Sequence, residues 1–128
     1  MTTWILAVLV LYLCQIYFTA IMYVPSTGLL RLAGGRDGLP EKGRLAGRAD
    51  RALLNLKENL PLFLVPAVLV YVVPNANADL AILGAQVFFW ARLAYVPFYI
   101  SGIPGPRSIA YGVALAGNLM IVAALFTG

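Results

Sequence analysis

Histidine is missing from this chain of 128 residues, and cysteine occurs only once, at Cys14. The lack of histidine removes the commonest metal ligand and the usual general base at neutral pH. A single cysteine excludes an intrachain disulfide and a cysteine cluster for a metal. We therefore expect no metal site. Any chemistry has to use arginine, tyrosine, serine, asparagine or a carboxylate, or a reactive group that a bound molecule brings.

Charge is also scarce, because only 11% of the residues are charged and 62% are hydrophobic. A soluble domain has about 25% charged and about 45–50% apolar residues. A soluble fold of this size has too little interior to bury so much apolar surface, so we expect an integral protein of the lipid bilayer. The net charge of +4 comes from cations at the ends of apolar runs, and we expect no nucleic-acid partner.

What the chain has in abundance is long apolar runs. A helix needs about 20 residues to cross a bilayer, and the second run reaches this length only by including the charged turns before it. We expect one all-α domain over residues 1–128, a transmembrane four-helix bundle. The runs are 4–24, 60–73, 80–100 and 109–126, with connections near 25–47, 74–79 and 101–106.

The connections differ in their charge, which predicts the orientation in the membrane. The second connection has no cation, and the third is followed at once by Arg107. Cytoplasmic loops carry an excess of lysine and arginine, so we expect the first and third connections in the cytoplasm and both termini on the other side. The first connection contains Arg31, Arg36, Lys42 and Arg44 against Asp37 and Glu41.

Polar residues occur at helical spacing in three places that this orientation puts at one depth. At about 100° per residue, five polar side chains before the second apolar run form a stripe about 100° wide. The third and fourth helices each add a polar face in their cytoplasmic halves. The stripe contains Arg48, Arg51, Asn55, Glu58 and Asn59; the third helix adds Arg92, Tyr95 and Tyr99; the fourth adds Arg107, Ser108 and Tyr111, with Asn118 two turns deeper.

Each of these residues also has a structural interpretation. Arg48 and Lys57 can reach lipid phosphates, Glu58 can join a salt bridge between helices, Asn55 can hold two helices together, and Arg107 can anchor a helix end. Together, however, four arginines with tyrosines and amides favour an anionic ligand with many hydrogen bonds, because arginine binds carboxylates bidentately. The apolar surroundings would admit a lipophilic partner from the bilayer.

Three motifs resemble those of the membrane-associated proteins in eicosanoid and glutathione metabolism, the MAPEG family. The resemblance covers essentially the whole chain, and the short length suggests a bacterial-type member in an inner membrane. The motifs are Arg48-x-x-Arg51-x-x-x-Asn55-x-x-Glu58-x-x-Pro61, Ala91-Arg92-x-x-Tyr95-x-x-x-Tyr99 and Arg107-Ser108-x-x-Tyr111.

The resemblance implies a homotrimer that binds glutathione as a thiol cosubstrate between neighbouring subunits, in sites open to the cytoplasm. Arg107 would stabilise the thiolate, with Ser108 and Tyr111 close to the sulfur. Tyr95 stands where some members carry histidine, and Arg31 is the only candidate for an arginine that some members place at the end of the first helix. The implied glutathione-binding residues are Arg48, Arg51, Asn55, Glu58, Arg92, Tyr95 and Tyr99.

Two functions follow as hypotheses. The first is a glutathione-dependent membrane transferase or peroxidase that acts on lipophilic electrophiles or lipid hydroperoxides. The second is a non-catalytic lipid-binding or scaffold protein of the same fold, in which the polar stripe serves subunit packing. Arg107 favours the enzyme, because a scaffold does not need a cation beside Ser108 and Tyr111. A transporter has less support, since no acid lies deep in a helix.

Overall fold

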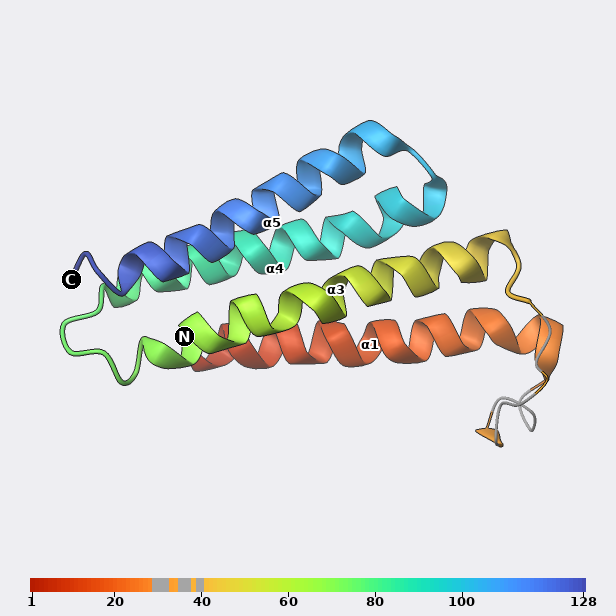
Figure 1. Cartoon of the computed structure of the whole chain (residues 1–128), viewed down its shortest axis with the longest axis horizontal. Helices are drawn as coiled ribbons and strands as arrows, with labels where there is room; N and C mark the ends of the chain where they lie inside the picture. Colours follow the sequence, from red (N-terminus) through yellow and green to blue (C-terminus); the bar gives the residue numbers. More distant parts are fainter. Residues whose placement is uncertain (29–32, 35–37, 39–40) are drawn as a thin grey trace.

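The computed structural model describes residues 1–28, 33–34, 38 and 41–128. Within these residues the chain forms four long helices and no strand, which confirms the all-α four-helix bundle (Figure 1). Each helix is long and apolar enough to cross a membrane. The helices are α1 (Thr2–Thr27), α3 (Arg44–Leu69), α4 (Ala78–Ser101) and α5 (Pro104–Ala124).

The helices run alternately up and down, with α1 beside α3 and α4 beside α5 (Figure 1). Both termini and the α3–α4 connection lie at one end of the bundle. Two contacts hold this end together. The hydroxyls of Thr2 and Tyr71 are 2.6 Å apart, and the backbone N–H of Asn77 donates to the backbone carbonyl of Ala124 at 2.8 Å. The start of α3 and the α4–α5 turn lie at the opposite end, where the polar motifs gather.

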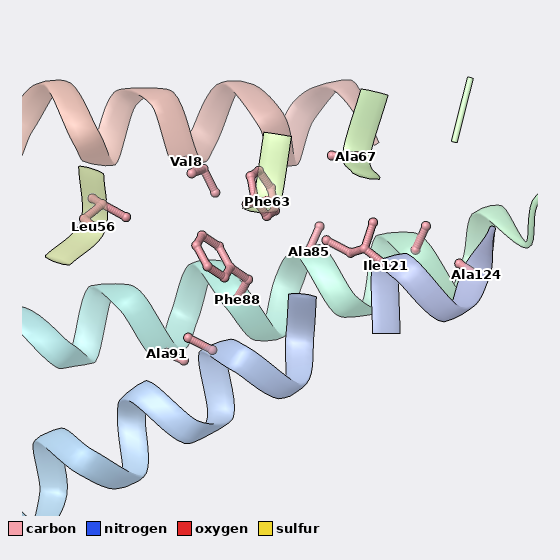
Figure 2. Packing of buried hydrophobic residues seen from close by; sticks show 11 residues of the cluster. Val8, Leu56, Phe63, Ala67, Ala85, Phe88, Ala91, Ile121 and Ala124 are labelled. Atoms are coloured by element: carbon pink, nitrogen blue, oxygen red, sulfur yellow. The ribbon is translucent and has the colours of Figure 1, made fainter. Parts of the chain in front are cut away.

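The core lies between the α1–α3 and α4–α5 pairs (Figure 2). Phe63 of α3 stacks on Phe88 of α4, with ring centroids 4.6 Å apart and planes 15° apart. Val8, Leu56 and Ile121 are fully buried around them. Such an aromatic pair adds about 0.5–1.5 kcal/mol beyond its buried area. This packing fixes the position of α3 along α4, and it thereby sets the level of their polar residues in the bundle.

The closest helix contact is between α4 and α5. A Cβ atom at Gly84 would lie 2.6 Å from the Gly117 carbonyl oxygen, and a Cβ at Gly117 would lie 2.6 Å from that of Gly84. Backbone atoms cannot move aside as a side chain can, so only glycine fits at these two positions. Small residues that let helices approach closely are typical of membrane bundles. The contact holds the start of α4 against the end of α5.

The helices extend further into the expected connections than the apolar runs suggested. The helix α3 begins at Arg44, so all charged turns before its apolar run are helical. The helix α5 begins at Pro104, which leaves only Gly102 and Ile103 between α4 and α5. The expected connection over 101–106 is therefore too long. A proline in the first turn lacks only an N–H that has no partner there anyway.

Part of the first connection is described. Lys42 forms an ion pair with Asp50 at 2.6 Å, and its ammonium lies 5.3 Å from the centroid of the Tyr23 ring. These contacts bind the end of the connection to α1 and α3. Of the other charges that predicted its orientation, Glu41 and Arg44 are described, whereas Arg31, Arg36 and Asp37 lie outside the described residues.

Candidate functional site

A buried arginine forms the back of the site. Arg92 of α4 is only 1% exposed, and its Nη1 donates a hydrogen bond of 2.7 Å to Oδ1 of Asn55 on α3. Its guanidinium also lies 4.4 Å from the centroid of the Tyr95 ring. Its Nε and Nη2 atoms have no acceptor among the described residues. A buried cation is costly unless it is paired, so this group favours an acceptor from outside the chain.

The polar stripe on α3 has one edge that faces α4 and one edge that is exposed. Asn55 is half-buried at the edge that meets α4, and its backbone carbonyl accepts a hydrogen bond of 2.8 Å from the Asn59 side chain. Arg51 and Glu58 are exposed and form no ion pair with a described residue. They lie about 60° and 80° around the helix from Arg48, away from α4. Within one chain, they do not reach the pocket.

A pocket of about 220 Å³ opens where the three polar motifs meet. It combines one residue of the α3 stripe, one of α4 and the whole motif at the start of α5. The expected convergence of the three clusters is therefore present for part of the set. The lining residues are Asn55, Tyr95, Arg107, Ser108 and Tyr111.

Arginines and tyrosines alternate along one side of the site. The guanidinium of Arg107 lies 4.9 Å from the centroid of the Tyr99 ring, and the Tyr99 and Tyr95 rings are 5.5 Å apart. Tyr95 in turn contacts Arg92. Such cation–π contacts orient a guanidinium without neutralising it. In the described part of the chain, the only ion pair joins Lys42 to Asp50. Arg107 is half-buried, and its charge stays free to meet an anion.

The two hydroxyls beside Arg107 are in different states. The Ser108 hydroxyl donates to the Pro104 carbonyl at 2.9 Å, one helical turn back. The Tyr111 hydroxyl makes no hydrogen bond to any described residue, and its side chain is 37% exposed. Tyr111 is thus ready to donate to a bound group, whereas Ser108 has to leave Pro104 first. Arg107 and Tyr111 are the stronger pair for an anion in this pocket.

Arg48 is the member of the predicted binding set whose contacts differ most from the expectation. It does not line the pocket. Its Nη1 donates to the carbonyl of Ile100, at the end of α4, at 3.0 Å. A backbone carbonyl leaves no signal in the sequence, so spacing and residue type could not predict this contact.

An apolar groove that the sequence does not predict lies beside the site. It lies on the surface between α4 and α5, with a volume of about 360 Å³. Its residues are typical of any lipid-facing helix surface, so only the packing of α4 on α5 shows that they form a groove. They are Ala91, Ala94, Phe98, Pro106, Ile109, Ala110 and Val113.

The described side chains include no group of three or more carboxylates or thiols that could hold a metal. The polar side chains of the site belong to arginine, tyrosine, asparagine and serine residues. A comparison with curated proteins found no match to the chain. The family model of the MAPEG family, in contrast, matches residues 1–127. The match covers nearly the whole sequence and all four membrane-spanning helices. The chain belongs to the MAPEG family.

Proposed function

We propose that this protein is a glutathione-dependent membrane transferase or peroxidase that acts on lipophilic electrophiles or lipid hydroperoxides. The observation that carries the proposal is the half-buried Arg107, in a pocket with the Tyr111 hydroxyl, where neither group has an ionic or hydrogen-bonding partner among the described residues. Membership of the MAPEG family, which includes such enzymes, supports the same conclusion.

The charges of the α3 and α4 motifs fit glutathione, which carries two carboxylates, one ammonium group and a thiol. Arg51 and Arg92 supply cations for the carboxylates, and Glu58 supplies an anion for the ammonium. The unsatisfied Nε and Nη2 atoms of Arg92 support the presence of an acceptor near them. Arginine suits this role because it stays charged and binds a carboxylate through two nitrogens.

Glutathione supplies a nucleophilic thiol when it is bound. A thiol has a pKa of about 8.5, and a nearby cation lowers it by stabilising the thiolate. Arg107 therefore raises the fraction of thiolate at neutral pH, because a lower pKa means more of the ionised form there. Tyr111 can donate a second hydrogen bond to the same charge. This activation requires no general base, in agreement with a chain that has no histidine.

Two reactions follow from an activated thiol. In a transfer, a sulfur–carbon bond forms and the bond to the leaving group breaks, and the leaving group departs with the electron pair. In a peroxide reduction, two thiols are oxidised to one disulfide, while the hydroperoxide is reduced to an alcohol and water. Arg107 can stabilise the sulfur in both, and Tyr111 can donate a proton to the departing oxygen or leaving group.

We propose that the site is completed in a homotrimer, with glutathione held between neighbouring subunits and the opening toward the cytoplasm. Arg51 and Glu58 support this arrangement, since they are exposed on the side of α3 that faces away from the pocket of their own chain. Charged side chains at membrane depth need partners. A neighbouring subunit and a bound ligand would supply them.

The rival function is that of a non-catalytic lipid-binding or scaffold protein. The apolar groove between α4 and α5 favours it, because this groove contains no charged residue and suits a lipid chain. Under this hypothesis Arg51 and Glu58 only join subunits. Binding of a polar thiol separates the two functions, because a scaffold has no use for it.

Calorimetry of the detergent-solubilised protein with glutathione tests the proposal. We expect the parent to bind, and Arg51→Ala to weaken binding by about 1.5–3 kcal/mol, the scale of charge-assisted hydrogen bonds. Lys57→Ala is the matched control, because Lys57 is an exposed cation on another side of α3. Unchanged affinity of an intact Arg51→Ala oligomer would remove Arg51 from the site. Absence of binding by the parent would favour the scaffold.

A further inference from the structure

We infer that Arg48 is a positioning residue: it caps the C-terminus of α4 and thereby fixes the short turn that places Arg107. Its effect on Arg107 rests on the proposed function, whereas the cap itself rests on geometry alone. Arg48 thus differs in role from the residues of the same α3 stripe that are proposed to bind the ligand.

Two contacts define the cap. Nη1 of Arg48 donates to the carbonyl of Ile100 at 3.0 Å, across 52 residues of sequence. The guanidinium also covers Gly102, where an added Cβ would lie 2.6 Å from Nη2 and 2.7 Å from Cζ and Nη1. Gly102 is the left-handed cap of α4, with φ 77° and ψ 16°. The start of α3 and the α4–α5 turn lie at the same end of the bundle (Figure 1).

The chemistry of a helix end explains why a cation lies there. The last carbonyls of a helix have no partner within it, and the helix dipole makes this end negative. The last turn of α4 has no basic residue of its own. Arg48 supplies from α3 the positive charge and the donor that α4 lacks. Nη1 of Arg48 is therefore bound to the Ile100 carbonyl, and its guanidinium packs on Gly102.

The capped turn connects directly to Arg107. The Gly102 amide donates to the Tyr99 carbonyl at 3.1 Å, and the Tyr99 ring contacts the Arg107 guanidinium. The helix α5 starts at Pro104, so Arg107 lies within its first turn. Arg48 thus holds the segment that precedes Arg107 in the chain. The same segment includes Tyr99, whose ring contacts Arg107. Loss of the cap is expected to displace the charge of Arg107 from the sulfur.

The test compares Arg48→Met, which keeps an apolar stem, with Arg48→Lys, which keeps a cation and a donor. Amide hydrogen exchange of the full-length protein, without ligand, tests the cap. We expect exchange of the amides of residues 99–103 to become about three- to thirty-fold faster in Arg48→Met, the scale of a lost helix-end charge and hydrogen bond. Arg48→Lys should restore part of the protection, and exchange in the first half of α4 should not change.

The second measurement is a pH titration of the thiolate absorbance of bound glutathione. We expect Arg48→Met to shift the titration to higher pH with an affinity within about three-fold of the parent, whereas Arg51→Ala loses affinity. Unchanged exchange in Arg48→Met would overturn the cap. Lost affinity without a shift in the titration would overturn the positioning role and make Arg48 a ligand-binding residue. A parent that binds no thiol contradicts the proposed function, and the exchange measurement still decides the cap.

Discussion

At the scale of single residues, the site depends on how one buried charge is satisfied. Arg92 is 1% exposed, and its hydrogen bond to Asn55 is the only one that it makes among the described residues. The Tyr95 ring covers its guanidinium without accepting a conventional hydrogen bond. Asn55 therefore has two roles: it joins α3 to α4 through the Arg92 guanidinium, and it lines the pocket itself.

Removal of the Asn55 side chain should therefore destabilise the protein as well as the site. Asn55→Ala leaves a buried charge without its acceptor, and we expect a loss of about 1.5–3 kcal/mol, the scale of a hydrogen bond to a charged group. Thermal unfolding in detergent, without ligand, measures this. Lys57→Ala, at an exposed position on the same helix, is the control and should change little. Equal stability of the two variants would contradict the role assigned to the Arg92–Asn55 bond.

At the scale of helices, residue spacing predicted the elements and the polar faces well. Apolar length identified the helices, and the helical period placed Asn55, Arg92 and Arg107 at one depth. In the structure Asn55 and Arg107 line one pocket, and Arg92 bonds to Asn55. Periodicity does not show which edge of a stripe a neighbouring helix covers. It therefore could not separate Asn55 from Arg51, nor predict the contact of Arg48 with a backbone carbonyl.

The α4–α5 packing gives a prediction with an internal control. Gly117→Ala places a methyl group 2.6 Å from the Gly84 carbonyl oxygen and 2.7 Å from the Phe88 amide nitrogen. We expect a destabilisation of about 1–3 kcal/mol, because the two helices have to separate. At Gly112, on the same helix, an added Cβ would have no atom of the described residues within 4 Å outside its own local helix backbone. Gly112→Ala should be neutral or stabilise by up to about 1 kcal/mol through helix propensity.

Thermal unfolding of the two glycine variants in the same detergent shows whether helix packing or helix propensity determines their stability. If Gly117→Ala is as stable as Gly112→Ala, the close approach of α4 and α5 is not a constraint on the fold. If only Gly117→Ala is destabilised, we also expect weaker thiol binding, because α5 carries Arg107 against the end of α4.

At the scale of the whole molecule, the main expectations are the orientation and the trimer. We expect the end that carries Gly43 and Arg107 to face the cytoplasm, and the end that carries Pro74 and both termini to face the other side. In a Cys14→Ser background, which removes the exposed native thiol, Pro74→Cys should react with an impermeant reagent only from the non-cytoplasmic side. Gly43→Cys should react only from the cytoplasmic side. The opposite pattern would reverse the orientation.

Native mass spectrometry in mild detergent tests the oligomeric state. We expect a trimer, because the exposed Arg51 and Glu58 of one chain need charged partners that the same chain does not supply among its described residues. Arg51→Ala with Glu58→Ala should weaken the trimer or its ligand binding. A monomer that binds glutathione with the affinity of the native assembly would contradict a site between subunits.

The central claim is that Arg107 creates a thiolate in a membrane protein without histidine. The most direct test is the ultraviolet absorbance of the thiolate when glutathione binds to the parent and to Arg107→Ala. We predict that the parent holds the thiolate well below the usual thiol pKa of about 8.5. Arg107→Ala should keep much of the binding but lose this signal at neutral pH, and Arg107→Lys should fall between the two. An intact Arg107→Ala oligomer with the same titration as the parent would contradict the claim.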